Sequence, residues 1–333
     1  MLSKRHGTGQ SPVGTAITSG YRERTSMRLQ HLHLLLTLAR TGSLRASAQA
    51  MSVTQPALTK ALKQLEEEFG TALVVRSPKG VRLAPAGELL AARAATVVRE
   101  IDRAREEVAW FSRNERTTVT VGVSPAAALL LAPGAIARFQ SRWPGVTVRL
   151  TDALYPKAQE RLRSGELDMA LGPLPAVGAG HDLRATPLLQ SESVIVANQH
   201  HPQRRARHLS ELHAARWILT GPRLGPGDPA NLGFEQHGLA PPQVTLECDS
   251  FSILLAMLPT MGALAVVPRH FFTIHAPKIG LVALDIVEPL PPTVIHLTTR
   301  AEGPLTLPSQ RLRDAFEQEA RVVLAAQARA DTP

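Results

Sequence analysis

The sequence has little cysteine and no long apolar run. Cys248 is the single cysteine, so no disulfide can form within the chain, and a reducing compartment, the cytoplasm, is expected. No run of about 18 apolar residues occurs, which argues against a membrane span. Residues 1–26 hold cations but no apolar core of a secretory signal, so we expect them to be disordered, or alternatively Met27 to be the true start.

Acidic residues are missing from a long N-terminal stretch. Between Arg28 and Leu65 there is no Asp or Glu. Residues 1–113 carry 17 Lys and Arg against 9 Asp and Glu, whereas the remaining 220 residues carry 20 against 19. A basic stretch is often a solvated face, but the complete absence of acids favours a surface that meets nucleic acid or an anionic membrane.

Three short helices are predicted within this acid-free stretch. Leucines fill residues 31–39, and Gly42 is expected to end that helix. Ser43 is a good N-cap for a helix over residues 44–51, and Thr54 is one for a third helix with Pro56 in its first turn. In the third helix, apolar residues recur at i, i+4, i+7 and i+11 and predict one buried face: Leu58, Leu62, Leu65 and Phe69. Gly70 is expected to end it.

A hairpin and a long helix are predicted next. Two short β-rich runs flank residues 77–80. After Pro85 a helix is predicted to about Ser112, with apolar residues stepping by four and three along a heptad seam: Leu90, Ala94, Val97, Ile101, Ala104 and Val108. The seam favours a dimer-forming linker, the alternative being a helix that packs on its own domain.

From Thr117 onward, strand patterns alternate with helix patterns. Strands are predicted at the runs TVTVGV, VTVRLT, LDMALG, SVIVAN, VTLEC, ALAVV and VIHLTT. Helices are predicted over residues 126–140, 157–164 and 309–327. This alternation predicts parallel sheets covered by helices, with ligands beyond the carboxyl ends of the strands.

The second and third short helices, joined by the run MSVT, predict a helix-turn-helix that places its second helix in a DNA major groove. The leucine face of that helix is used for packing, so four polar side chains point away from the core: Gln55, Thr59, Lys60 and Lys63. Gln can form a bidentate hydrogen bond with adenine, and Thr can contact a thymine methyl group. Lys can contact guanine or a phosphate. The helix N-terminus at Thr54 favours a phosphate. The first carboxylates of this helix, Glu66–Glu68, lie on its last turn, about 10 Å along the helix axis from the residues expected to contact the bases.

The predicted hairpin supplies further cations, which contact the backbone or an adjacent minor groove and add affinity more than sequence choice: Arg76, Lys79 and Arg82. A helix-turn-helix pattern alone is a moderate signal. The order of helix-turn-helix, basic wing and heptad helix is a much more specific one.

The runs SLRASAQAMSVTQPALTKALKQLEEEFG and LVVRSPKGVRLAPAG, followed by a linker helix, resemble the LysR-type transcriptional regulators. The resemblance covers residues from about Met27 to the C-terminal helix. It implies DNA contacts at Gln55, Pro56, Thr59, Lys60 and Lys79. Ala84 departs from the usual Thr. The runs ALYPKAQERLRSGELDMAL, ECDSF and GPRLGPG look closest to a branch with regulators of aromatic sulfonate breakdown.

The resemblance implies an α/β protein with an N-terminal winged helix-turn-helix, a long dimerisation helix and a C-terminal two-lobed effector domain similar to periplasmic binding proteins. The expected divisions are residues 1–26, 27–85 and 86–113, then lobe I at 114–189 with 292–333, and lobe II at 190–291. Expected partners are promoter DNA, a small organic anion, further copies of this chain as a dimer or tetramer, and RNA polymerase.

Candidate effector residues follow from helix starts, loops and the resemblance. Ser124 and Ser250 each precede a predicted helix and offer an anion site, with a plain N-cap as the alternative. Tyr155 either contacts the effector or belongs to the core. Arg223 either pairs with a carboxylate or sulfonate, or is a surface residue. The same loops add Thr220, Gly221 and Phe251.

Other functions are disfavoured. No nucleophile elbow, phosphate-binding loop or dinucleotide motif occurs, so an enzyme is not expected. The pairs His31/His33 and His200/His201 lack further ligands, so no metal or cofactor is predicted. Cys248 is more plausible as a buried structural residue than as a sensor. Two alternatives to an effector-responsive regulator stay open: a cytoplasmic solute-binding protein, and a DNA-binding protein without an effector response.

Overall fold

The structure is a computed structural model. The chain forms two compact units, Met1–Arg99 and Glu100–Pro333. The structure describes residues 28–78, 80–113, 117–175, 178–223, 225, 228–274 and 276–330. The predictions for residues 1–26 and Lys79 lie outside these ranges. Among the described residues, no helix has both the length and the apolar character that crossing a membrane requires.

The first unit starts with three helices, α1 (Leu29–Thr41), α2 (Leu44–Ala50) and α3 (Gln55–Phe69). The predicted caps are confirmed. The Ser43 side chain accepts from the Ala46 N–H, and the Thr54 side chain accepts from the Ala57 N–H. Gly42 and Gly70 end their helices in the left-handed region, with φ of 63° and 65°.

The core of this unit is made of leucines from α1 and α3. Leu34 and Leu38 of α1 pack against Leu58 and Leu62 of α3, and each is at most 2% exposed. Phe69 was expected on the same buried face, but it is 45% exposed. That expectation was wrong because α3 ends at Phe69, and the side chain lies past the region that α1 covers.

The predicted hairpin forms from β1 (Val74–Ser77) and β2 (Gly80–Leu83), which pair antiparallel. The Val81 N–H donates to the Gly42 carbonyl at 2.8 Å. Gly80 has φ of 123°, and a Cβ there would lie 2.7 Å from the Gly42 oxygen, so no other residue fits without displacing backbone. The hairpin is thereby fixed to the end of α1.

The long helix α4 (Pro85–Arg113) follows. Its start packs on its own unit, since Ala94 and Val98 are buried with Leu32. Leu89 and Val97 are 67% and 46% exposed. Local packing is therefore confirmed for the Ala94 part of the seam, while pairing of α4 with a second copy stays a prediction.

The second unit contains two lobes. Lobe I has a five-stranded sheet in the order β4-β3-β5-β12-β6. Its strands are β3 (Thr117–Val123), β4 (Val146–Asp152), β5 (Met169–Gly172), β6 (Leu183–Ser191) and β12 (Thr293–Arg300). Its helices are α5 (Pro125–Leu130), α6 (Ala132–Arg142), α7 (Lys157–Arg163) and α11 (Leu307–Ala330).

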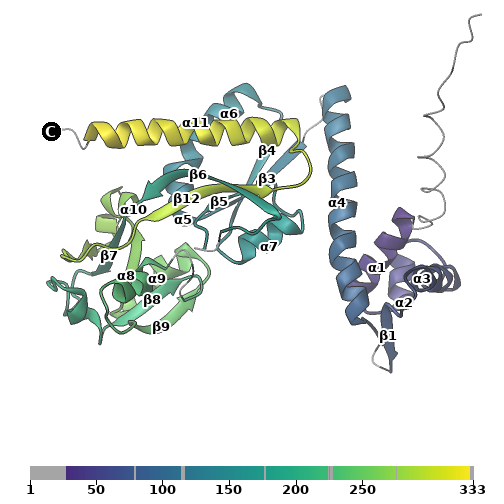
Figure 1. The fold of residues 1–333 in the computed structure, drawn as a ribbon, viewed down its shortest axis with the longest axis horizontal. Helices are drawn as coiled ribbons and strands as arrows, with labels where there is room; N and C mark the ends of the chain where they lie inside the picture. The colour runs from purple at the N-terminus through teal and green to yellow at the C-terminus, as the bar shows by residue number, and fades with distance from the viewer. Residues whose placement is uncertain are drawn as a thin grey trace, which may run out of the picture. The chain divides into compact units, whose positions relative to one another are not determined.

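In lobe I, α6 and α11 cover one face of the sheet and α7 covers the other (Figure 1). Phe139 of α6 and Phe316 of α11 are at most 2% exposed in the larger core. Leu162 of α7 is buried in the smaller one. An ion pair of 2.6 Å between Arg138 and Glu319 also joins α6 to α11.

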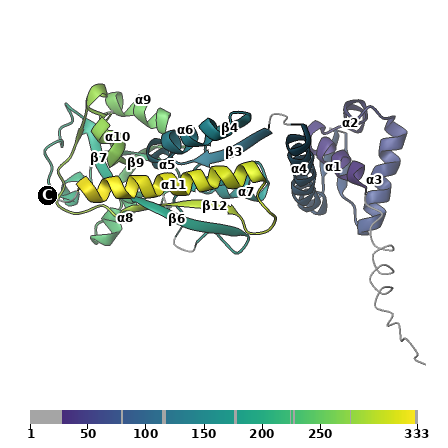
Figure 2. The same cartoon turned by 90° about the horizontal axis from the view of Figure 1, so that it is seen from above.

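Lobe II has a sheet in the order β11-β7-β10-β8-β9. Its strands are β7 (Ser193–Asn198), β8 (Arg216–Thr220), β9 (Gln243–Cys248), β10 (Leu264–Pro268) and β11 (Leu281–Ala283). Its helical segments are η1 (Leu209–Leu212), α8 (Pro229–Gln236), α9 (Phe251–Met261), α10 (Arg269–Ile274) and η2 (Ala276–Ile279). The helices α8 and α9 lie on opposite faces of the sheet (Figure 2).

Two fold predictions for this unit were wrong. The sheets are mixed, because β12 runs antiparallel to β5 and β6, and β7 runs antiparallel to β10 and β11. The helix predicted over residues 126–140 is divided at Leu131 into α5 and α6. Pro133 lies in the first turn of α6, where its missing N–H costs little, whereas inside one continuous helix it would remove a hydrogen bond.

Candidate functional site

The N-terminal turns of α3 present the polar side chains that the sequence predicted. Gln55, Pro56 and Lys60 are exposed, as is Thr54 at the N-cap, and Thr59 is half-buried. Lys63 is exposed and forms a 3.5 Å ion pair with Glu67. Because the leucines of α3 face the core, these side chains form one open surface of the helix.

The wing adds cations from a separate segment of the chain. Arg76 on β1 and Arg82 on β2 are both exposed. The two strands are held in register by the Arg76–Val81 and Val75–Arg82 pairs. The open surface of α3 and the two wing arginines together make the candidate DNA surface.

Two polar contacts that the sequence did not predict hold this surface in place. The Glu66 carboxylate accepts from the Leu73 N–H at 2.9 Å and the Val74 N–H at 3.3 Å, which ties the end of α3 to the wing. Ser47, which is fully buried, bonds to the Thr41 hydroxyl at 2.6 Å, which ties α2 to α1. Glu66 therefore faces backbone amides and adds little negative charge to the reading surface.

A cleft lies between the two lobes, at the carboxyl ends of several strands, with a cavity of about 80 Å³. Its lining is Ser124, Pro125, Ala126, Leu154, Pro173, Ser191, Ser193, Thr220, Pro229, Phe251, Val266, Val267, Pro268 and Thr293. Residues after β3 and β5 come from lobe I, and residues after β8 and β9 come from lobe II. The expected position of a ligand site in such sheets is thereby present.

Three of the predicted effector residues line the cleft, namely Ser124, Thr220 and Phe251. Gly221 lies one residue beyond the lining, and a Cβ there would be 3.9 Å from Leu154. Tyr155 lines a separate small cavity inside lobe I. Roles for these residues in binding stay predictions.

The remaining two predicted effector residues lie outside the lining. Arg223 is exposed on the loop after β8. Ser250 precedes α9, and its hydroxyl meets the Ser252 hydroxyl at 2.9 Å.

The serines before α5 and α9 differ in what their side chains do. Ser124 is 3% exposed, and its hydroxyl accepts from the Ala127 N–H as an N-cap. Ser250 makes no capping hydrogen bond, so the first turn of α9 keeps backbone donors for another acceptor. The plain N-cap interpretation fits Ser124.

Among the described residues, the cleft lining holds hydroxyls and apolar groups but no charged side chain. Ser191, Ser193 and Thr293 belong to it and were not predicted. They stand at the two crossovers between the lobes, at the end of β6, at the start of β7 and at the start of β12. The sequence could have indicated these three residues, because their hydroxyl side chains lie next to the predicted crossovers.

An ion pair joins the two lobes near the cleft. The Lys157 ammonium lies 2.6 Å from the Asp249 carboxylate, and both side chains are about two-thirds exposed. The hydrogen bond from Lys157 holds the pKa of Asp249 below its usual value. This contact favours the arrangement of the lobes seen in the structure.

Family models match both parts of the chain. Residues 29–88 match the bacterial regulatory helix-turn-helix protein of the lysR family, and residues 112–321 match the LysR substrate binding domain. The chain belongs to the LysR-type transcriptional regulators. Membership establishes a DNA-binding regulator with an effector-binding domain, as the motifs indicated.

Named relatives of this LysR-type chain are also regulators. The HTH-type transcriptional regulator TdcA of Escherichia coli strain K12 is 28% identical over 241 residues, which cover 72% of this chain and 77% of that protein. The SDS degradation transcriptional activation protein of a Pseudomonas species is 27% identical over 261 residues, covering 77% and 84%. The expected class, a regulator and not an enzyme, agrees with these relatives.

Solved structures of LysR-type proteins share the fold. CbnR, a LysR family transcriptional regulator, matches with a TM-score of 0.66 at 19% identity and covers 88% of this chain and 99% of that one. Full-length CbnR complexed with its target DNA matches with a TM-score of 0.65 at 19% identity, covering 89% and 100%. At this identity the likeness concerns the fold.

The part of this LysR-type chain that the structure describes contains no group of three or more His, Cys, Asp or Glu placed to hold a metal ion. Cys248 is half-buried, with its sulfur 3.4 Å from the Leu219 carbonyl oxygen. Burial raises the pKa of the Cys248 thiol, which favours its protonated form.

Proposed function

We propose that this regulator binds promoter DNA as a homotetramer in the cytoplasm, and that a small organic anion held between the two lobes changes this binding. The observation that carries the proposal is the pairing of two features in one chain. One is an open polar face on α3 beside a basic wing, and the other is an interlobe cleft at strand ends. Contact with RNA polymerase belongs to the same proposal and is supported by family membership alone.

For the DNA contacts, we propose that α3 enters the major groove with its N-terminal turns toward the bases. Gln55, Thr59 and Lys60 would contact base edges, and Thr54, Pro56 and Lys63 would contact the backbone or edges beside them. The wing residues Arg76, Lys79 and Arg82 would contact phosphates. The exposure of the residues that the structure describes supports this assignment.

For assembly, we propose that α4 pairs with α4 of a second copy. Leu89 and Val97 leave apolar area open on this helix, and such area is stabilised when another helix covers it. The proposed divisions of the chain stay at residues 27–85 for DNA binding and 86–113 for the linker. Lobe I then comprises 114–189 with 292–333, and lobe II comprises 190–291.

For the effector, we propose a small aromatic carboxylate or sulfonate. Phe251 and Leu154 offer apolar surface to a ring, while Ser193 and Thr220 offer hydroxyl donors to an acid group. The first turn of α9 adds backbone donors with positive character. The described residues of the lining include no carboxylate that would repel an anion. Arg223, exposed on the loop after β8, stays a proposed partner of the acid group.

Thermal shift of the full chain tests the effector proposal. Benzoate and benzenesulfonate are compared with neutral benzyl alcohol at the same concentration, because a ligand that binds only the folded protein raises the unfolding temperature, and a tighter ligand raises it more. We expect larger shifts with the acids. Thr220→Val should reduce these shifts, and Thr260→Val, at the exposed far end of α9, should not. Equal shifts with the alcohol, or no loss in Thr220→Val, contradict the proposed ligand class.

A further inference from the structure

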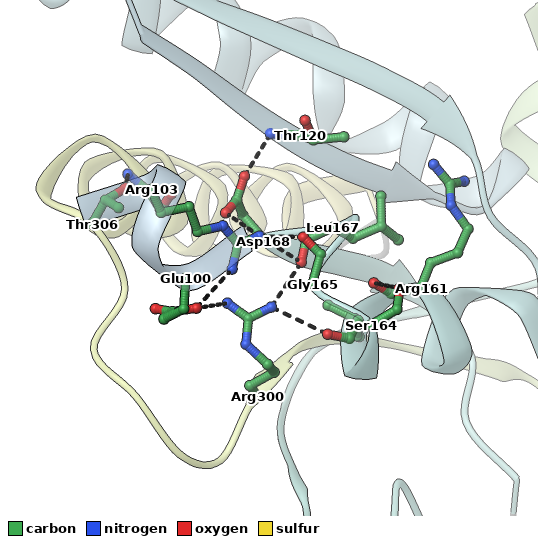
Figure 3. A network of polar contacts seen from close by, with 12 residues as sticks. Glu100, Arg103, Thr120, Arg161, Ser164, Gly165, Leu167, Asp168, Arg300 and Thr306 are labelled. Carbon is green, nitrogen blue, oxygen red and sulfur yellow. Dashed lines mark hydrogen bonds and ion pairs between the residues drawn. The ribbon is translucent and has the colours of Figure 1, made fainter. Parts of the chain in front are cut away.

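The C-terminal half of α4 is attached to lobe I by charged residues (Figure 3). Arg103 is the main contact. Its guanidinium donates to the Gly165 carbonyl at 2.6 Å and lies 3.0 Å from the Asp168 carboxylate. The side chains of Arg103 and Asp168 are only 15% and 11% exposed. The pair is therefore shielded from water on both sides.

Asp168 is itself fixed to the sheet. One carboxylate oxygen faces Arg103, and the other accepts from the Thr120 N–H at 2.8 Å. The Asp168 N–H donates to the Thr120 carbonyl at 2.9 Å. The carboxylate thus connects α4 to β3 through two different oxygen atoms.

Two further contacts accompany this pair. Glu107 of α4 accepts from the Leu307 N–H at 3.0 Å, at the start of α11. Glu100 of α4 lies 3.8 Å from Arg300, which also donates to the Leu162 and Leu167 carbonyls at 3.1 Å. Glu100, Arg103 and Glu107 therefore each reach a different part of lobe I.

A short path connects Asp168 with the cleft. Asp168 directly precedes β5, and Pro173, directly after β5, lines the cleft. Within β5, the Leu171 carbonyl accepts from the Ser124 N–H at 2.7 Å. A Cβ on Gly172 would lie 3.2 Å from the Ser124 side chain, so the strand and the cleft wall are in close contact.

We propose that Arg103 and Asp168 are positioning residues that make residues 100–113 of the linker helix move with lobe I. Removing one member of a shielded ion pair leaves the other charge without compensation, which costs far more than losing an exposed pair. The boundary between the two compact units falls at Arg99 and Glu100, inside α4, which agrees with this assignment. The proposal deepens the proposed function, since it names how a change in lobe I reaches the DNA-binding end.

Three single variants of the full chain test the proposal. Arg103→Gln removes the cation. Asp168→Asn keeps an oxygen for the Thr120 N–H and removes the charge that faces Arg103. Arg105→Gln is the matched control, because Arg105 is 66% exposed and its ion pair with Asp102 lies within α4.

The first measurement is amide hydrogen exchange of residues 104–113. Exchange reports the free energy of local opening, and we expect it to become about 10-fold faster in Arg103→Gln and Asp168→Asn. Arg105→Gln should match the unaltered protein, and so should residues 55–69 in all variants. Unchanged exchange in both test variants would overturn the proposal.

The second measurement separates coupling from a purely structural role. A duplex selected from a random library with the unaltered protein is built with two copies of the site, in register or shifted by about 5 bp, half a helical turn. A stiff connection between the linker helix and lobe I makes the protein bind one of the two site spacings more tightly. The ratio of the affinities for the preferred and the other duplex should therefore fall by about 5-fold or more in both test variants.

An equal loss of affinity on both duplexes, or faster exchange with an unchanged ratio, would overturn the coupling role. If the unaltered protein binds neither duplex, the proposed DNA function fails. The exchange measurement then still decides whether Arg103 and Asp168 hold the helix.

Discussion

The two units of this protein build their functional surfaces in different ways. In the first unit, the candidate reading residues lie within nine consecutive positions of one helix, Gln55 to Lys63. In the second, the cleft is assembled from residues between Ser124 and Thr293, which come from several elements of both lobes. The DNA surface therefore depends on local sequence, and the cleft depends on the packing of the whole unit.

This difference predicts how each surface responds to substitution. A side chain on the open face of α3 can change while the helix and its leucine core stay in place. A change in the cleft wall acts on strands that also hold the lobes together. Four experiments test this contrast.

The largest effect is expected from Leu62→Ala in the core of the first unit. Leu62 is 1% exposed against α1, and truncating a buried leucine costs about 2–5 kcal/mol. Amide exchange of the full chain should show loss of protection over residues 29–69 and little change over residues 193–268. Lys63→Ala, exposed on the same helix, is the control. Comparable loss in both units would contradict the independence of the first unit.

A smaller effect is expected from Gln55→Ala on the open face of α3. Loss of a base contact should relax base preference by about 1–3 kcal/mol and leave folding intact. Arg82→Ala in the wing should instead weaken binding to all DNA sequences alike. It should also lower the slope of log affinity against log salt concentration by about one. Binding to a panel of duplex variants at several salt concentrations checks both. If Gln55→Ala weakens every duplex by one common factor, the reading-helix assignment is wrong.

The pH dependence of the second unit should be moderate. His201 in lobe II and His296 in lobe I have a pKa below the ordinary value of 6.5, mainly because burial disfavours the charged ring. The unfolded chain then binds protons more readily, so stability is full above about pH 6.5 and falls as the pH drops toward the folded values.

Urea unfolding followed between pH 5 and 8 checks this. His201→Asn should flatten the profile, because the neutral amide can still accept the Gln203 N–H that the ring nitrogen accepts at 3.1 Å. His200→Asn, at the exposed neighbouring position, should leave the profile as it is. A profile that stays steep in His201→Asn would assign the effect to other groups.

The smallest effect is expected from Lys157→Gln at the interlobe ion pair. Both partners are exposed, so the loss in stability of the second unit should be slight and should vanish at high salt. Because the pKa of Asp249 is lowered, the contribution is present above about pH 4 and disappears as the pH falls through the folded value. A loss that persists in high salt would indicate packing of the lysine stem and not charge.

The same contrast explains how much could be predicted from the sequence. Ser43, Thr54, Gly42 and Gly70 act on their own helix ends, so the boundaries of α1, α2 and α3 were predictable within a residue or two. The exposed residues of α3 followed from the leucine period alone. The exposure of Phe69 did not, because it depends on where α1 stops covering α3.

In the second unit, the missing predictions are those that need distant partners. The run RWILT of β8 is too short and too evenly apolar to distinguish a strand from a buried helix segment. The antiparallel direction of β12 follows from its return from lobe II, which no local pattern records. Arg103 and Asp168 are 65 positions apart, and their pairing was not predicted for the same reason.

The contact between Gly42 and Gly80 has a consequence for redesigning this protein. The loop after α1 and the strand β2 of the wing meet through main-chain atoms, so this one contact between α1 and the wing does not depend on any side chain. Surface residues on either element are thus free to be exchanged to retarget DNA affinity. A larger residue at position 80 would shift the whole wing and alter the footprint itself.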